Sequence, residues 1–284
     1  MLCTLSPLWR DGMNIKYVVS SMIFWWRENP VSFEQECDFL RSQGYGIEMW
    51  PNIKGHQECR YERGNWDRLI EATKGMVVSM HGRVDYPDIE QWKEQIECAK
   101  LLNAHLVTDL PNFGIPEGTS INGCDFSAEV IKIARDSGVQ LCLETGQLDK
   151  MVKLAEKFDS VRFCLDTGFA NIDPVYTFKQ YVDELAAKTT HLHLCDNYGQ
   201  IDDHEPPGLK GGIPRENWEY LIESLKKYNN TVVASFEMFP PGPYVMLRQA
   251  SEFIFDELNW PFRPKKNYTP RRKIRTKISK KSPE

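Results

Sequence analysis

Short apolar stretches alternate along the chain with longer stretches in which apolar residues recur every three or four positions. The short stretches are rich in β-branched residues and are typical of buried strands, whereas the periodic stretches are typical of amphipathic helices. Strands are predicted at 17–24, 46–50, 76–81, 105–109, 139–144, 161–166, 190–195 and 231–238. Helices are predicted between and after them, at 32–42, 65–73, 88–102, 127–136, 148–157, 178–187, 215–228 and 244–257.

This alternation is typical of a single α/β domain, a (β/α)8 TIM barrel of about 250 residues. Strands that are apolar almost throughout are buried on both faces, as in a parallel sheet covered by helices. An open, doubly wound sheet is the alternative, but such a sheet usually has a glycine-rich turn after its first strand. The first predicted strand instead ends in Phe24-Trp25-Trp26-Arg27, without a glycine, and this favours the barrel.

Several helix ends carry local signals. Ser32 with Gln35 has the spacing of a capping box at a helix start. Gly44, Gly75 and Gly138 follow predicted helices, where a left-handed cap is expected.

Basic residues are concentrated at the C-terminal end. Residues 263–284 contain ten Lys or Arg and one Glu, so that, with a net charge of −5 for the whole chain, the first 262 residues carry −14. Few apolar residues and repeated prolines predict a disordered, basic C-terminal tail. We therefore expect a barrel domain at 14–262 and a tail at 263–284. Because the barrel is acidic, nucleic acid is not expected as its partner, and only weak contact by the tail stays open.

Targeting signals are weak. The longest apolar run, at 17–26, is ten residues long and is broken by two serines, whereas a membrane span needs roughly 20. The first twelve residues contain Trp9, Arg10 and Asp11 and lack the apolar core of a signal peptide. Eight cysteines without a CxxC pair argue against a zinc ribbon and predict free thiols. We expect a cytoplasmic protein with no membrane partner.

The last four predicted strands deliver polar side chains to the barrel end at which enzymes of this fold place their chemistry. These side chains are Glu144, Asp166, His193 and Glu237. Three carboxylates brought together repel one another unless a cation lies among them, and carboxylates with one imidazole suit Mn²⁺, Mg²⁺ or Zn²⁺. Any one of the four alone could be a capping or salt-bridged residue. Their recurrence at corresponding strand ends favours one divalent metal ion as the cofactor.

The same region contains the motifs LETG (143–146), LDTGFAN (165–171), HLHLCDNYG (191–199), DDHEPPGLKGG (202–212) and FEM (236–238). In these motifs the chain resembles the xylose isomerase-like TIM barrels, over roughly residues 15–257. This superfamily includes sugar and sugar-phosphate isomerases and epimerases and the endonuclease IV-type nucleases. In its ketose epimerases and isomerases, residues matching the four side chains above bind one divalent metal. The resemblance implies the same ligands here, with Glu144 and Glu237 also transferring the proton beside the carbonyl.

The implied activity is isomerisation or epimerisation of a sugar or sugar phosphate, carried out through an enediolate. A metal ion polarises the carbonyl, one carboxylate removes the neighbouring proton, and return of the proton to the other face or to the next carbon gives the product. A sugar-acid lyase or dehydratase would use the same enolisation and is an alternative. The intact set of four residues argues against a catalytically inactive barrel with a binding role.

An endonuclease IV-like phosphodiesterase acting on abasic DNA is a further alternative. Asp202 and His204 form a pair that binds an additional zinc in the nucleases of the superfamily. Two other expected histidines are missing: Phe169 stands three residues after Asp166, and residues 108–111 read Thr-Asp-Leu-Pro at the end of the strand predicted at 105–109. These departures count against phosphodiester cleavage and predict that only one ion is held tightly.

Other side chains near the same mouth are candidates for substrate binding. They are His81, Glu48, Asp202, His204, Lys210, Trp50 and Phe169. Trp50 and Phe169, with Trp25 and Trp26, could form an apolar wall for a sugar, although aromatics are also common core residues. His81 could instead be a hydrogen-bonded core residue, and Glu48 a plain salt bridge. The oligomeric state is open; relatives are often dimers or tetramers, so a homo-oligomer is compatible with the sequence.

The glycine-rich segment 206–214, with Lys210, could expose backbone N–H groups to a substrate phosphate or simply form a tight turn. Three cysteines share the inward face of the ligands, because side chains alternate along a strand. Cys142 and Cys164 should be small interior residues below the metal. Cys195 should point to the mouth as the thiol that reacts near the site.

Overall fold

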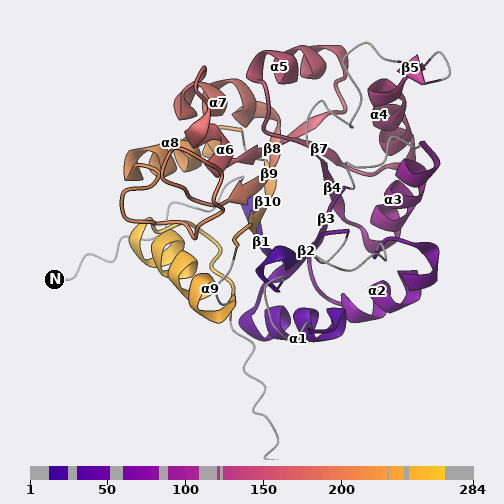
Figure 1. The fold of residues 1–284 in the computed structure, drawn as a ribbon, viewed down its shortest axis with the longest axis horizontal. Helices are drawn as coiled ribbons and strands as arrows, with labels where there is room; N and C mark the ends of the chain where they lie inside the picture. Colours follow the sequence, from indigo (N-terminus) through magenta and orange to yellow (C-terminus); the bar gives the residue numbers. More distant parts are fainter. Residues whose placement is uncertain are drawn as a thin grey trace, which may run out of the picture.

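The computed structural model describes residues 13–24, 31–51, 60–82, 89–108, 120–121, 124–228, 230–239 and 243–265. In these residues, parallel strands close into one barrel surrounded by helices (Figure 1). Around the barrel the order is β1 (Asn14–Ser20), β10 (Thr231–Phe236), β9 (Thr189–Leu194), β8 (Arg162–Asp166), β7 (Leu141–Glu144), β4 (His105–Thr108), β3 (Val78–His81) and β2 (Gly46–Met49). The predicted (β/α)8 fold is confirmed, and the open doubly wound sheet is wrong.

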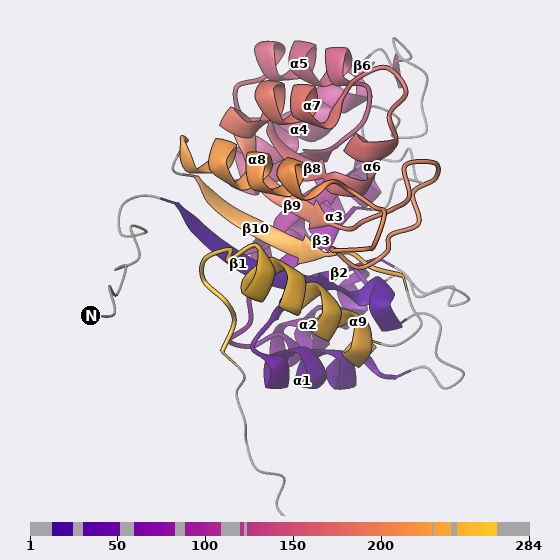
Figure 2. The same cartoon turned by 90° about the vertical axis from the view of Figure 1, so that its left-hand side faces the viewer.

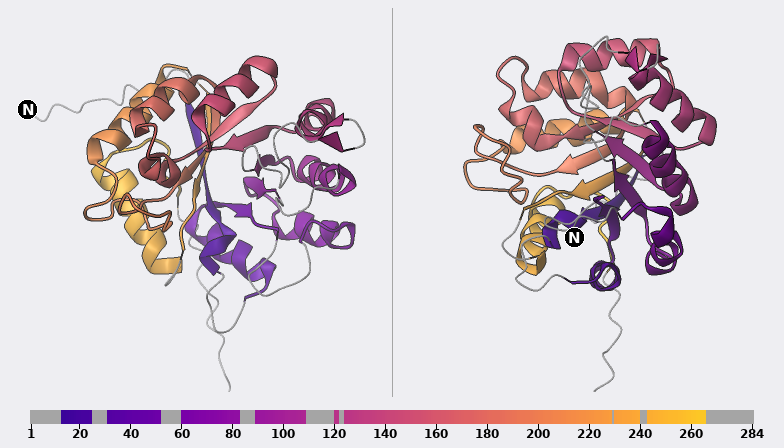
Figure 3. Two further views of the ribbon diagram at one scale, coloured as in Figure 1. Left: turned by 45° about the horizontal axis from the view of Figure 1, so that its top comes forward. Right: turned by 45° about the vertical axis from the view of Figure 1, so that its right-hand side comes forward.

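Helices cover the outside of the barrel, as Figure 3 shows from two further sides. They are α1 (Phe33–Gln43), α2 (Trp66–Ala72), α3 (Ile89–Leu102), α4 (Phe126–Ser137), α5 (Leu148–Lys157), α7 (Phe178–Leu185), α8 (Arg215–Lys226) and α9 (Pro243–Ser251). Single helical turns lie at Ser21–Phe24, Arg63–Asn65 and Ala186–Lys188, and a π-helical segment, Glu252–Glu257, continues α9. A short antiparallel pair, β5 (Ser120–Ile121) and β6 (Cys124–Asp125), precedes α4.

The first strand begins earlier than predicted and ends earlier. Asn14 pairs with Thr231 of β10, and the chain leaves the sheet at Ser21 to form a 3-10 turn up to Phe24. All four residues of this turn are buried, and the Ser21 hydroxyl accepts the backbone N–H of Trp50 at 3.0 Å. The apolar run therefore indicated burial correctly but not backbone conformation.

A further helix, α6 (Thr167–Ile172), was not predicted. It begins directly at the end of β8, where the Asp166 side chain accepts the backbone N–H of Phe169 at 2.7 Å and caps the helix. Its six residues are too few to show a helical period, which explains why the pattern of the sequence did not reveal it.

The predicted caps are present. Ser32 and Gln35 form the capping box, with N–H to side-chain distances of 3.4 and 2.9 Å. Gly44, Gly75 and Gly138 have φ values of 84°, 75° and 74°. Such left-handed conformations are costly for residues with a Cβ, which accounts for glycine at the ends of these helices.

The described part of the chain continues past the predicted domain boundary at residue 262. The Arg263 guanidinium pairs with Asp256 and lies over the ring of Phe255. The backbone of Lys265 packs against Gly44 so closely that a Cβ on Gly44 would lie 2.2 Å from its carbonyl oxygen. Packing on the barrel thus extends to residue 265, and the prediction of a disordered tail concerns residues 266–284, which lie outside the described residues.

The barrel interior differs from the larger core between sheet and helices. Val107, Cys142 and Cys164 form a separate small apolar cluster inside the barrel, as the alternation of side chains predicted for the two cysteines. The strand arrows of β9 and β10 point toward the side on which the loop between β9 and α8 projects (Figure 2). None of the described helices is long and apolar enough to cross a membrane.

Candidate metal centre

Four side chains from neighbouring strands meet at the carboxyl end of the barrel. Glu144 ends β7, Asp166 ends β8, His193 lies in β9, and Glu237 follows β10 directly. One ligand atom of each lies within 4.8 Å of those of the other three, and all four residues are buried. The strand register explains the meeting, because His193 pairs with Asp166 on one side and with Ser235 on the other.

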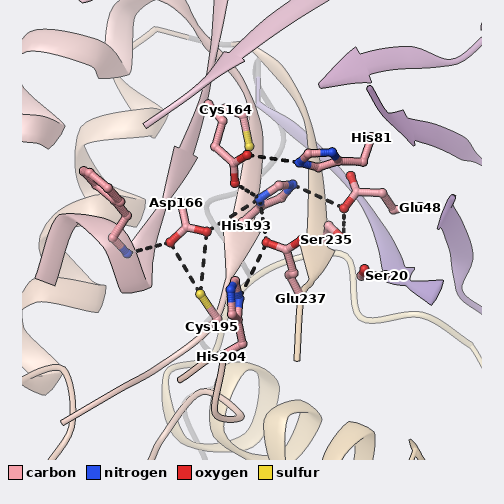
Figure 4. A network of polar contacts seen from close by, with 12 residues as sticks. Ser20, Glu48, His81, Cys164, Asp166, His193, Cys195, His204, Ser235 and Glu237 are labelled. Atoms are coloured by element: carbon pink, nitrogen blue, oxygen red, sulfur yellow. Dashed lines mark hydrogen bonds and ion pairs between the residues drawn. The ribbon is translucent and has the colours of Figure 1, made fainter. Parts of the chain in front are cut away.

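His193 lies at the centre of this cluster (Figure 4). Its Nδ1 contacts Glu144 Oε1 and lies 2.7 Å from Glu237 Oε2 and 3.6 Å from Asp166 Oδ2. One ring nitrogen carries at most one proton and cannot donate to three carboxylates. Both oxygens of Glu237 are buried without a hydrogen bond from any described residue. Glu237 therefore lacks a compensating hydrogen bond, and the set of three carboxylates and one imidazole fits a hard or borderline divalent cation.

The electrostatics of the cluster indicate the same need for positive charge. Burial lowers the pKa of His193, but the surrounding groups, chiefly Cys164, Glu237 and Glu144, raise this pKa well above its usual value. Burial raises the pKa of Glu144, but the neighbouring His193 lowers it well below its usual range. The carboxylates thus favour a cation among them. A divalent ion would meet this demand with the imidazole as a neutral ligand.

His81, at the end of β3, contacts the cluster through Glu144. Its Nε2 lies 3.1 Å from Glu144 Oε2, and its Nδ1 lies 3.0 Å from the carbonyl oxygen of Gly82. The ring stacks on Trp50 with 3.9 Å between centroids and 14° between planes. The structure therefore brings His81 next to Glu144, where it also orients that carboxylate, and Trp50 stacks on the His81 ring.

Glu48 lies in the barrel interior and not at the mouth. Its side chain has no exposed surface, and its oxygens accept hydrogen bonds from Ser79 Oγ and Ser235 Oγ, each at 3.0 Å. The two nearest imidazole nitrogens are Nε2 of His191 at 2.8 Å and Nε2 of His193 at 3.2 Å. These contacts favour the salt-bridge interpretation over a hydrogen bond to a sugar. His191 was not singled out from the sequence, although its spacing of two from His193 places it on the same inward face.

Asp202 and His204 lie beside the cluster on the loop after β9. His204 Nε2 is 3.3 Å from Asp202 Oδ2, and His204 Nδ1 is 3.8 Å from Glu237 Oε2. Burial and then the charge of Asp166 raise the pKa of Asp202 to about 7. Burial lowers the pKa of His204, but the carboxylates of Glu237 and Asp166 outweigh it and raise this pKa. The predicted pair therefore shares the electrostatic field of the cluster.

Of the other substrate-binding candidates, Phe169 packs its ring edge-on against Tyr181, with 6.4 Å between centroids, while its backbone N–H is bound to Asp166. Lys210 is exposed on the loop. The predicted aromatic neighbours Trp25 and Trp26 lie outside the described residues.

Asp196, which the sequence interpretation missed, organises the loop between β9 and α8. It is fully buried, and its carboxylate accepts backbone N–H groups at 2.7–3.1 Å. The donors are Asn197, Gly208, Leu209 and Ile213. The glycine-rich segment does bind an anion, but this anion is the carboxylate of Asp196, so these amides are not available to a substrate phosphate. Gly212 allows the close approach, since a Cβ there would lie 2.3 Å from Asp196 Oδ1.

Cys195 does not match the predicted reactive thiol. It is buried, and its sulfur lies 3.4 and 3.7 Å from the two carboxylate oxygens of Asp166. Burial and the negative charge of Asp166 raise the pKa of Cys195 well above its usual value. A reactive cysteine needs an accessible thiolate in a positive environment, and parity along the strand could predict neither the burial nor the neighbouring carboxylate.

Comparison with known proteins agrees with the observed barrel fold. Residues 79–257, more than half of the chain, match the family model described as xylose isomerase-like TIM barrel. No curated protein sequence matches the chain at a significant level.

Similar solved structures share the fold at low sequence identity. A D-psicose 3-epimerase solved in the presence of D-fructose is 13% identical, with a TM-score of 0.60 over 86% of this chain and 100% of that chain. A D-allulose 3-epimerase from Methylomonas sp. is 13% identical, with a TM-score of 0.58 over 86% and 98% of the two chains. A xylose isomerase domain protein from Planctomyces limnophilus is 14% identical, with a TM-score of 0.53 over 86% and 96%.

Proposed function

Because this chain belongs to the xylose isomerase-like TIM barrel family, we propose that it is a divalent-metal-dependent isomerase or epimerase of a sugar or sugar phosphate. The observation that carries this proposal is the buried cluster of three carboxylates around His193, in which Glu237 has no hydrogen-bond donor among the described residues. Glu144, Asp166, His193 and Glu237 are the proposed ligands of one ion, either Mn²⁺, Mg²⁺ or Zn²⁺.

The two glutamates are the proposed proton carriers. Glu144 and Glu237 come from β7 and from the end of β10, with β8 and β9 between them, so that a substrate above His193 would have one carboxylate on each side. When bound, a divalent ion acidifies the C–H bond beside a carbonyl by polarising that carbonyl. Glu144, held at Oε2 by His81, and Glu237, beside His204, then remove and return the proton.

The surroundings favour a small polyhydroxylated substrate over a phosphorylated one. Trp50 and His81 offer a stacked aromatic surface beside Glu144, and Asp202 and His204 offer polar groups beside Glu237. Two of the similar structures are 3-epimerases of the same ketohexose, named psicose in one and allulose in the other. Three amides of the glycine-rich segment, those of Gly208, Leu209 and Ile213, are used by Asp196 and are not available to a phosphate group. We therefore place unphosphorylated ketoses first among the substrates to test.

Phosphodiester cleavage of abasic DNA is the second candidate, and the position of His204 favours it. His204 and Asp202 extend the cluster beyond Glu237, as an additional ion site would require. Against it, the first 262 residues carry a net charge of −14, which repels the phosphate backbone. Phe169 also provides no metal ligand at the position where many relatives have a histidine.

One experiment distinguishes the two candidate functions. The full-length protein, loaded with Mn²⁺, Mg²⁺ or Zn²⁺, is incubated with a panel of ketoses and ketose phosphates and, in parallel, with an abasic DNA duplex. The proposal predicts a new sugar isomer or epimer, detected by NMR, whose formation stops when the ion is chelated. Cleavage of the DNA without any change in the sugars would replace the proposal by the nuclease.

A further inference from the structure

A second layer of polar residues lies below the proposed ligands, centred on Glu48. We propose that Glu48 is a positioning residue, which holds the Nε2 proton of His193 and thereby directs Nδ1 of the same ring, as a lone pair, toward the metal. This inference rests on the proposed function, because it assigns a role relative to the proposed metal ligands.

The two ring nitrogens of His193 face different partners, as Figure 4 shows. Nδ1 faces the carboxylates of Glu144, Asp166 and Glu237, and Nε2 lies 3.2 Å from Glu48 Oε1 on the opposite side of the ring. A neutral imidazole has one N–H and one lone pair. A carboxylate next to Nε2 stabilises the proton on that nitrogen, and Nδ1 is then the ligand atom.

Glu48, in β2, is itself held in place by side chains of two other strands. Ser79 of β3 donates to its Oε2, and Ser235 of β10 donates to its Oε1, both at 3.0 Å. His191 Nε2 lies 2.8 Å from Oε2. Two hydroxyl donors and two imidazoles thus surround both oxygens, so the carboxylate cannot turn away from His193 without losing these contacts.

The burial of this group argues for a role beyond packing. Glu48, His191 and His193 have no exposed surface, so Glu48 is not accessible to a substrate. Taking a carboxylate out of water costs several kcal/mol unless charge and hydrogen bonds compensate. Apolar residues would fill the barrel interior at lower cost, as Val107, Cys142 and Cys164 do in the neighbouring layer. A carboxylate behind a metal-binding histidine fixes its tautomer and raises its basicity, and its removal typically weakens metal binding by about 10–100-fold.

The test compares Glu48→Gln with a matched control, Glu36→Gln, in the full-length protein. Glu36 is also fully buried, but it pairs with Arg60 at the outer layer, where Arg60 Nη1 and Nη2 lie 3.0 and 2.9 Å from its oxygens. Both substitutions remove one buried charge, and only the first alters the surroundings of His193. Mn²⁺ affinity is measured by calorimetry, and folding is checked by thermal denaturation of the metal-free proteins.

The proposal predicts that E48Q weakens Mn²⁺ binding by about 10–100-fold, that E36Q leaves it unchanged, and that Glu48→Asp restores part of the loss. Folded E48Q with wild-type affinity, or an equal loss in E36Q, would overturn it. A measurement on the wild type needs no variant: in the Zn²⁺-loaded protein, ¹H–¹⁵N correlation should place the His193 proton on Nε2. A proton on Nδ1 would also overturn the inference. Wild-type protein that binds no ion would overturn the proposed function as well, so the two failures are distinguishable.

Discussion

Replacing Asp196 by Asn should loosen the loop that carries Asp202 and His204 without disturbing the strands of the proposed metal centre. Asp196 Oδ1 accepts the N–H groups of Asn197 and Ile213, and Oδ2 accepts those of two further loop residues. An Asn side chain keeps one oxygen and places an NH₂ group where the other stood, so two backbone donors lose their acceptor and face a donor instead.

The expected loss in the free energy that stabilises the loop follows from these two lost hydrogen bonds. A hydrogen bond to a charged group contributes about 1.5–3 kcal/mol. Burial raises the pKa of Asp196 in spite of its four donors, so part of each bond offsets the cost of burying the charge. We therefore take the lower value, which gives a loss of about 3 kcal/mol for the pair. At about 1.4 kcal/mol per factor of ten, amide exchange within the loop should accelerate about 100-fold.

Hydrogen exchange followed by mass spectrometry, on peptides covering residues 205–214, measures this effect directly. Asp203→Asn is the control, because it makes the same chemical change on the same loop and the Asp203 carboxylate has no hydrogen bond or ion pair with a described residue. If the account is right, KM rises in D196N while Mn²⁺ affinity stays close to wild type. Unchanged exchange in D196N would refute the argument that this carboxylate holds the loop.

Three further predictions concern the centre and the chain end. Glu144→Gln and Glu237→Gln should each lower kcat by at least about 100-fold and weaken metal binding, while circular dichroism shows an intact fold; near-normal turnover would remove that residue from the mechanism. Adding Mn²⁺ to metal-free protein at about 100 times its Kd should raise the free energy of unfolding by about 2.7 kcal/mol in denaturant titrations, with one ion per chain by elemental analysis; two or three tightly held ions would favour the nuclease. A chain ending at Lys265 should keep its melting temperature and activity, and a large loss of either would show that residues 266–284 pack on the barrel.

Much of the fold and part of the candidate site could be predicted from the sequence, because both follow from two periodicities. The repeated change from apolar runs to helical spacing predicted the barrel, and alternation along the strands predicted that Cys142 and Cys164 share the inward face of Glu144 and Asp166. The end of β1 was less predictable, because the run from Tyr17 to Phe24 is buried throughout yet leaves the sheet at Ser21.

The sequence could not predict how deep a side chain lies within the barrel or which residues far away in the chain it contacts. Alternation tells which way Glu48 points but not that Ser79 and Ser235 enclose it below His193. The glycine-rich segment was interpreted either as a site for a substrate phosphate or as a tight turn. Its amides bind a side chain of the same protein, Asp196, which lies 12 or more residues earlier in the chain. Such pairings depend on how the loop folds back onto the barrel, and no local pattern encodes that path.

The central claim is that a divalent ion held at His193 lets two glutamates transfer a proton beside a carbonyl. Incubation of the metal-loaded protein with ketoses in D₂O tests it most directly, with deuterium incorporation followed by NMR and mass spectrometry. The account predicts incorporation at the carbon beside the carbonyl, lost on chelation, restored by adding the ion, and absent in E144Q and E237Q. Incorporation that persists in both variants, or that does not depend on a divalent ion, would contradict it.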